Sequence, residues 1–203
     1  MGKIRTFVKT AQNAAFDFWE GLQTTFSGIK TSIWIPKTTD TNANAAIKPK
    51  GNGANLAQDP DGTATGGNAR GEYATDWQKI RSNAADVASG DQSTISGGQD
   101  NVAGANYATV GGGFNNNSTG VYSTISGGQS NTSSGTRSFI GSGLGNTSSS
   151  DYSTVGGGID NTATNTHATV GGGDRNDATG VASTIGGGVN NQVDGQKSVI
   201  AGG

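Results

Sequence analysis

The stretch YSTISGGQSNTSSG at residues 122–135 returns at residues 152–165 as YSTVGGGIDNTATN. Related segments fill the chain from residue 91 to residue 203, and equivalent positions are always 15 residues apart. A β-branched aliphatic residue recurs at this period, at Ile95, Val110, Ile125, Ile140, Val155, Val170, Ile185 and Ile200. A fixed period with matching columns is typical of a solenoid, in which each repeat forms one coil.

Two further columns indicate tight corners between short strands. Glycine follows each aliphatic position by three residues and asparagine follows it by six, as in Gly98, Gly113, Gly128, Asn101, Asn116 and Asn131. Both residue types tolerate the positive φ that sharp corners require. The threonines beside the aliphatic residues favour extended structure. We therefore predict a mainly β fold, a parallel β-roll or β-solenoid with 15-residue coils, in which these glycines and asparagines form the corner turns.

The predicted core is sparse. Because side chains alternate across a strand, Ile95 and Ser93 should point inward while Thr94 points outward. A second column, from Gln99 to Val189, is apolar in only about half of its positions. Burying one aliphatic side chain contributes roughly 1.5–3 kcal/mol, whereas ordering each backbone residue costs roughly 1–2 kcal/mol. We therefore predict a homotrimer whose shared core is the aliphatic column; the alternative is a monomeric solenoid with a core of small residues.

One coil departs from this pattern. Phe139 replaces the usual threonine, and Ser142 replaces the first glycine of a corner. Glycine is the residue that most readily adopts the backbone conformations of corners. We therefore expect this coil to bulge.

The repeats resemble the heads of trimeric autotransporter adhesins, which form left-handed parallel β-rolls around a threefold axis. They also resemble segments of tail fibres and other virion fibres of bacteriophages and large viruses, as does the preceding stretch of residues 47–90. The resemblance covers about half of the chain through its repeats. It implies a trimeric protein with a structural or attachment role.

The chain before the repeats divides into three segments. Residues 1–30 are predicted to form an amphipathic helix with a heptad-like stripe. Its apolar surface includes Val8, Phe18, Trp19, Leu22 and Phe26. Three uses fit this helix: docking onto another virion component, a short trimeric coiled coil, or packing onto its own chain. Residues 31–72 form a connector rich in Gly, Asn and Pro.

Residues 73–90 are predicted to form degenerate coils that begin the solenoid. Ile80 and Ala88 lie fifteen residues before Ile95 and Ala103, so we expect them to share those columns. Such coils would cover the first edge of the regular layers, which would otherwise invite uncontrolled pairing. Residues 91–203 form the regular solenoid, which we expect to continue beyond residue 203.

Composition disfavours several classes of function. The net charge is −2, and no run of about 18 apolar residues occurs, so we expect neither nucleic-acid binding nor membrane insertion. The chain has no cysteine. An autotransporter adhesin would need an export signal and a membrane anchor, and we find neither pattern. A virion protein assembled in the host cytoplasm needs neither.

The motifs that could carry chemistry are weak. His167 is the only histidine, so we expect no metal, no cofactor and no enzyme activity. It belongs to an outward column with Tyr107, Tyr122 and Tyr152, which we interpret as stacked supports between coils rather than as a glycan-binding ladder. The threonine column that begins at Thr94 suggests an ice-binding array, but its second outward position is Ser, Gly or Ala.

The sequence thus predicts a structural virion protein, the particle-proximal part of a phage tail fibre used for host attachment. The N-terminal segment would bind tail, baseplate or adaptor proteins, and a distal region would bind the host receptor. The alternatives are a trimeric cell-surface adhesin head, a capsid fibre and, less favoured, an ice-binding solenoid.

Overall fold

The computed structural model describes residues 31–33, 47–49, 55–56, 60, 62–63 and 67–203. The chain separates into two units, residues 1–51 and 52–203. In the first unit, β1 (Thr31–Ile33) and β2 (Ile47–Pro49) pair antiparallel. The helix predicted for residues 1–30 lies outside the described residues, together with Val8, Phe18, Trp19, Leu22 and Phe26.

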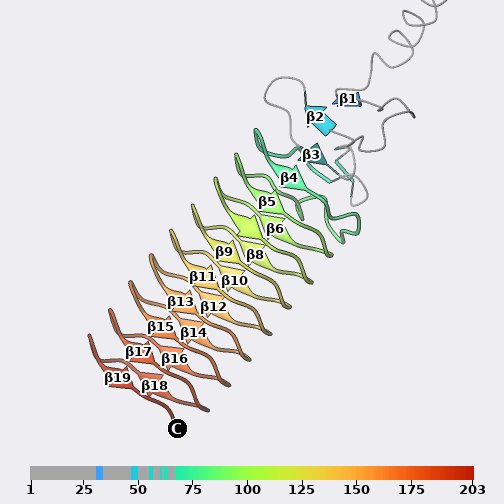
Figure 1. The fold of residues 1–203 in the computed structure, drawn as a ribbon. Coiled ribbons are helices and arrows are strands. Elements are labelled where there is room, and N and C mark those ends of the chain that lie inside the picture. Colours follow the sequence, from blue (N-terminus) through green and yellow to red (C-terminus); the bar gives the residue numbers. More distant parts are fainter. Residues whose placement is uncertain (1–30, 34–46, 50–54, 57–59, 61, 64–66) are drawn as a thin grey trace, which may run out of the picture. The chain divides into compact units, whose positions relative to one another are not determined.

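The second unit is an all-β solenoid of about eight turns, with coils of about 15 residues (Figure 1). Its larger sheet contains β3 (Asn55–Leu56), β4 (Thr75–Asp76), β5 (Thr94–Ile95), β7 (Thr109–Val110), β9 (Thr124–Ile125), β11 (Phe139–Ile140), β13 (Thr154–Val155), β15 (Thr169–Val170), β17 (Thr184–Ile185) and β19 (Val199–Ile200). Its smaller sheet contains β6 (Val102–Ala103), β8 (Asn117–Ser118), β10 (Thr132–Ser133), β12 (Thr147–Ser148), β14 (Thr162–Ala163), β16 (Asp177–Ala178) and β18 (Gln192–Val193). The predicted fold class is confirmed.

Each coil is joined to the next along three lines of parallel pairing. In the larger sheet, Thr94 pairs with Thr109, and in the smaller sheet Val102 pairs with Asn117. At the corner between the sheets, single bridges link equivalent residues, beginning with Ile80 to Gln99. Strands of two residues suffice because every strand inside the stack is paired on both sides.

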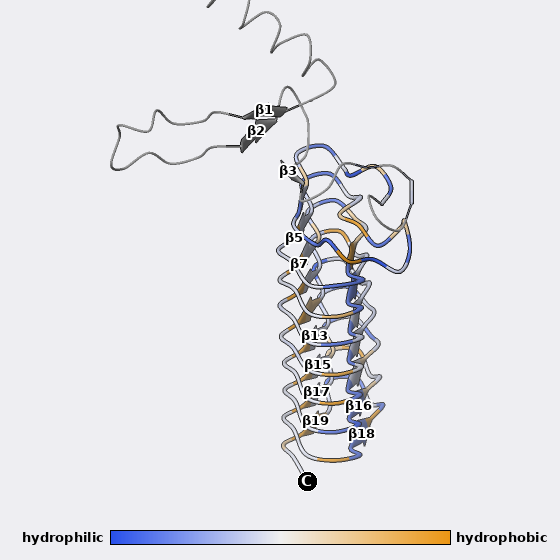
Figure 2. Ribbon diagram, turned by 90° about the vertical axis from the view of Figure 1, so that its right-hand side faces the viewer, coloured by the Kyte–Doolittle hydropathy of each residue, from blue (hydrophilic) through white to orange (hydrophobic). Residues whose placement is uncertain are grey.

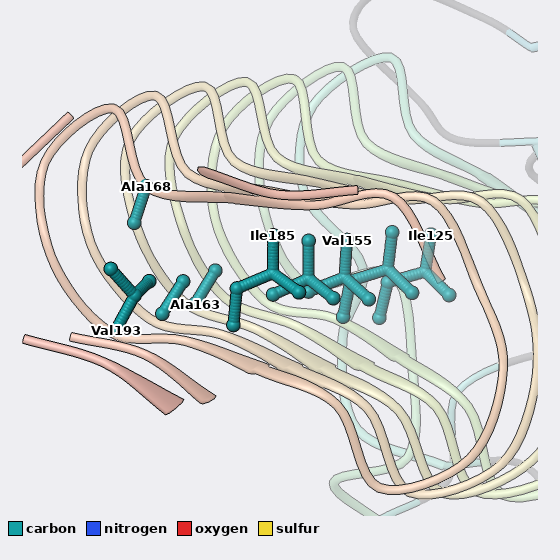
Figure 3. Close-up of a cluster of buried hydrophobic side chains, with 9 residues drawn as sticks. Ile125, Val155, Ala163, Ala168, Ile185 and Val193 are labelled. Carbon is teal, nitrogen blue, oxygen red and sulfur yellow. The ribbon is translucent and has the colours of Figure 1, made fainter. Parts of the chain in front are cut away.

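The core is a narrow layer between the two sheets. Figure 3 shows Ile125, Val155 and Ile185 in a row along the interior, with Ala168 on one wall and Ala163 on the other. Figure 2 colours the larger sheet partly hydrophobic and the smaller sheet mostly hydrophilic. The aliphatic column therefore lies on one wall and faces small residues on the other.

The aliphatic column belongs to the core of a single chain, which corrects its predicted place at a shared trimer axis. Every member from Ile95 to Ile185 is 0% exposed in one chain, and Ile200 is partly buried. The opposite wall carries residues such as Ala103 and Ser118, both fully buried. This wall leaves a gap that one aliphatic side chain per coil can fill. The trimer itself stays a prediction.

Serines in this core are paired where they face one another across a coil. The hydroxyls of Ser118 and Ser123 lie 2.6 Å apart, and the same pairing joins Ser133 to Ser138. Ala103 and Ala108 are matched in the same way. Since a buried hydroxyl costs free energy unless it is hydrogen-bonded, the paired serines avoid this cost. Ser93 and Ser183, which fall five residues after Ala88 and Ala178, are the exceptions, because their buried hydroxyls have no hydrogen-bond partner.

The asparagine column is part of the core, whereas the sequence suggested only a corner role. Its members from Asn101 to Asn176 are 0% exposed and do not have positive φ. The Oδ1 of Asn101 accepts hydrogen bonds from the backbone N–H and the Nδ2 of Asn116, at 3.0 and 3.2 Å. The Nδ2 of Asn116 also donates to the carbonyls of Gly112 and Gly128. The amides thus hold the corner from inside.

The second glycine of each corner is sterically required. Gly113 has a φ of 95°, and a Cβ there would lie 2.1 Å from the carbonyl oxygen of Gly128 in the next coil. Gly98 and Gly128 are in the same situation. Since real Cβ atoms never approach a backbone oxygen so closely, any side chain here would push the coils apart.

The coil with Phe139 and Ser142 does not bulge, contrary to the sequence-based expectation. Phe139 pairs regularly with Thr124 on one side and Thr154 on the other. Ser142 replaces the first glycine of the corner and does not have positive φ. A Cβ at the equivalent Gly127 would meet nothing within 4 Å. The position therefore accepts a side chain without distortion.

The first coil is present but has a different register from the one predicted. Asp76 pairs with Ile95, and Ile80 bridges Gln99, so both lie 19 residues before their partners rather than 15. Ala88 is fully buried beside the smaller sheet, as predicted. Four additional residues between Ile80 and Ala88 account for the two different offsets.

A buried ion-pair cluster fills the core of this first coil. Asp76 takes the place of the aliphatic residue, and its Oδ2 lies 2.9 Å from Arg70 Nε and 3.1 Å from Arg81 Nη2. The Oε1 of Gln78 accepts a hydrogen bond of 2.9 Å from the backbone N–H of Asn101. Gln78 thereby begins the ladder of buried side-chain amides that Asn101 and Asn116 continue. The ion pairs compensate the burial of the Asp76 carboxylate.

Candidate interaction surfaces

The described residues contain no group of three or more His, Cys, Asp or Glu side chains that could hold a metal ion. No helix in the same part of the chain is long and apolar enough to cross a membrane. The candidate sites are therefore surfaces of the solenoid: its two edges and the outward faces of its two sheets.

One edge carries a stack of aromatic and cationic side chains. The rings of Tyr107 and Tyr122 stack with centroids 4.5 Å apart and planes at 6°, and Tyr152 stacks on His167 at 4.9 Å and 2°. The guanidinium of Arg137 lies between, 5.2 Å from the Tyr122 ring centroid and 5.6 Å from that of Tyr152. The five side chains form one continuous column.

This stack supports the turns on which it lies. All five residues have positive φ, between 57° and 62°, which costs roughly 1–2 kcal/mol for a residue other than glycine. Aromatic pairs contribute about 0.5–1.5 kcal/mol beyond their buried area, and cation–π contacts at exposed sites about 0.5–1 kcal/mol. The predicted stacking between coils is confirmed, and the ring faces that a glycan would need are largely occupied by neighbouring side chains.

The other edge carries an apolar column that we call the corner ridge. It consists of Ile80, Gln99, Phe114, Gln129, Leu144, Ile159, Asp174 and Val189, which are linked by consecutive parallel bridges. Its five large apolar side chains are 42–60% exposed. The sequence indicated a half-apolar column here, but not that it faces solvent. Its apolar members are therefore available for contact with another molecule.

The polar members of the corner ridge carry little net charge. Asp174 is the only ionisable residue in the column, and it accepts two hydrogen bonds of 3.0 Å from Arg175, through Nε and Nη2. These hydrogen bonds and the adjacent negative charge raise the pKa of Arg175. Gln99 and Gln129 are neutral amides. The ridge is thus close to electrically neutral along its whole length.

The outward faces of the two sheets carry hydroxyl groups. The larger sheet has one threonine column, with glycine or serine at most of the next outward positions. The smaller sheet has two adjacent outward columns, for example Thr147 with Ser149 and Thr162 with Thr164. The sequence-based search for a threonine array considered only the larger sheet. The double column was missed because the smaller sheet's strands had not been placed.

No known protein-family model matches this sequence, and no curated protein has a significantly similar sequence.

Proposed function

We propose that this chain is a subunit of a trimeric virion fibre, the particle-proximal part of a phage tail fibre, and that its solenoid is a stiff spacer. The main support is the uninterrupted pairing of every coil from β4 to β19. Eight turns at about 4.8 Å per turn give a rod of roughly 38 Å. A spacer of this kind holds a receptor-binding part away from the particle.

Stiffness follows from how each coil is joined to its neighbours. Bending the rod would have to lengthen hydrogen bonds along three lines of pairing as well as in the asparagine ladder. The amide groups of that ladder are buried, and a buried donor or acceptor left without a partner costs about 1–3 kcal/mol. The solenoid therefore resists both bending and sliding of its coils.

The trimer would serve attachment by multiplying weak contacts. Three distal regions on one fibre convert the second and third binding events into intramolecular ones, and this can raise the overall affinity by roughly 10²–10⁴. In this proposal the N-terminal segment binds other virion proteins, and the fibre is assembled in the host cytoplasm. Capsid rather than tail attachment would use the same rod.

Immunogold electron microscopy tests this function. An antibody raised against residues 91–203 should label the tail fibres of virus particles whose genome encodes this chain. Label at capsid vertices would support the capsid-fibre alternative. Label on the surface of uninfected cells would contradict the proposal and support the adhesin alternative.

The double hydroxyl column of the smaller sheet favours a second candidate, an ice-binding solenoid. Parallel coils repeat their hydroxyls at about 4.8 Å, and outward positions 119 to 164 form a nearly continuous array of Thr and Ser. A measurement of thermal hysteresis on the full chain tests this candidate. If activity is present, Thr147→Lys should abolish it; absence of hysteresis would rule the candidate out.

A further inference from the structure

We infer that the corner ridge is the surface through which copies of this chain contact one another, parallel and in register. This inference rests on the proposed trimer and assigns its contact. The aliphatic column from Ile95 to Ile185 cannot supply the contact, because it is already 0% exposed in one chain. Phe114, Leu144 and Ile159 are 42–46% exposed and can still be buried by a partner.

The pattern along the ridge fits a second copy of the same chain. In register, each apolar residue faces its own equivalent. Gln99 and Gln129 would face their equivalents too, and an amide can both donate and accept a hydrogen bond. The one charge that would meet a like charge, on Asp174, is paired with Arg175 within its own chain. No position along the ridge therefore opposes self-association.

The order of residues along the ridge selects this register. A shift by one coil would place Phe114 against Gln99 or Gln129, and Val189 against Asp174. A reversed copy would place Leu144 opposite Gln129. Of the arrangements that pair all eight coils, only the parallel, unshifted one places apolar residues opposite apolar residues and polar residues opposite polar residues throughout. It is also the arrangement that rotation about an axis along the rods produces, so three copies can close into a ring.

Cysteine cross-linking of the full chain tests the contact, since the protein has no cysteine of its own. Leu144→Cys changes an exposed ridge residue, and Ser149→Cys is the matched control, because it is exposed in the same coil on the face of the smaller sheet. Mild oxidation, or a short bifunctional maleimide, should link Leu144→Cys chains into a covalent dimer on a non-reducing gel. Ser149→Cys chains should stay unlinked.

A mixed sample tests direction and register. Leu144→Cys chains and mass-tagged Gln129→Cys chains, co-expressed, should each cross-link to their own kind and not to each other. Cross-links only between the two variants would show an antiparallel contact or one shifted by a coil, and either would overturn the inference. Cross-linking of Ser149→Cys chains without cross-linking of Leu144→Cys chains would also overturn the inference.

Light scattering on the same samples separates the two levels of the proposal. A mass of three chains without Leu144→Cys cross-links would overturn the ridge assignment and leave the trimeric fibre standing. A mass of one chain would overturn the proposed trimer together with the ridge contact. A mass of three chains with Leu144→Cys and Gln129→Cys each linked to its own kind is the expected result.

Discussion

The Oδ1 atom of Asn131 accepts hydrogen bonds from both the backbone N–H and the Nδ2 of Asn146, one coil further along, at 3.0 and 3.1 Å. Asn131 in turn donates to Asn116 and to the carbonyls of Gly127 and Gly143. The ladder fastens neighbouring coils from inside the core.

Asn131→Leu should therefore destabilise the solenoid although it preserves volume and adds apolar surface. The change removes the side-chain hydrogen bonds to Asn116 and Asn146 and leaves buried partners unsatisfied, at about 1–3 kcal/mol for each. We expect a loss of roughly 3–5 kcal/mol in the free energy of unfolding, measured by urea denaturation. Asn115→Ser is the control and should change stability little. An unchanged urea midpoint for Asn131→Leu would show that the ladder contributes nothing.

Gly113→Ala should be far more damaging than Gly127→Ala in the next coil. A Cβ at Gly113 would lie 2.1 Å from a backbone oxygen at a φ of 95°, whereas a Cβ at Gly127 would meet nothing within 4 Å. We expect a loss of about 2–4 kcal/mol for the first variant and less than about 0.5 kcal/mol for the second. Thermal melts followed by circular dichroism measure both. Equal melting temperatures would contradict the corner geometry.

Asp177→Asn should stabilise the protein at neutral pH. Burial raises the pKa of Asp177 above its ordinary value of 3.8, and the charge of Asp194 adds to this rise. Hydrogen bonds from Thr179 and Gln192 lower the pKa of Asp194, so Asp194 stays ionised. Because the folded pKa of Asp177 is the higher one, ionisation of its carboxyl group destabilises the fold progressively as the pH rises above 3.8, and the effect is complete above the folded pKa.

The pH dependence is the measurement that checks this effect. The difference in unfolding free energy between Asp177→Asn and the unchanged protein should be absent below about pH 3.8 and should grow as the pH rises through the raised pKa. It should stay below about 1 kcal/mol, since the side chain is partly solvated. A difference that is largest in acid and vanishes at neutral pH would reverse the assigned sign.

Val155→Asp should unfold each chain rather than only separate the subunits. Val155 is 0% exposed between the two sheets of one chain, and an unpaired charge there costs more than about 4 kcal/mol. The far-ultraviolet circular dichroism of the solenoid should be lost, whereas Leu144→Asp on the exposed ridge should retain it. A folded Val155→Asp monomer would return the aliphatic column to a trimer interface.

Sequence reasoning found the period, the inward aliphatic column and the corner glycines because each depends on local rules. Alternation across a strand places Ile95 and Ser93 inside, and both are fully buried. The supporting role of the column around Tyr122 also followed from its 15-residue spacing, since side chains at this spacing lie one above another.

The remaining features depended on three-dimensional pairing that the repeat alone does not specify. The sequence predicts a corner turn at Asn116 because asparagine favours turns. Its burial in the core was not predicted, because it depends on the opposite sheet. The register of Ile80 depended on four additional residues in the first coil. The aliphatic column was predicted at a shared axis because the repeat alone does not show that the smaller sheet of the same chain covers Ile95 to Ile185, which are 0% exposed.

The mass of the full chain in solution, measured by light scattering with size-exclusion chromatography, tests the account of a fibre subunit most directly. The account predicts three times the chain mass of 20.2 kDa, with the circular dichroism of an intact solenoid. A folded solenoid with a mass of 20.2 kDa at the same concentration would contradict it.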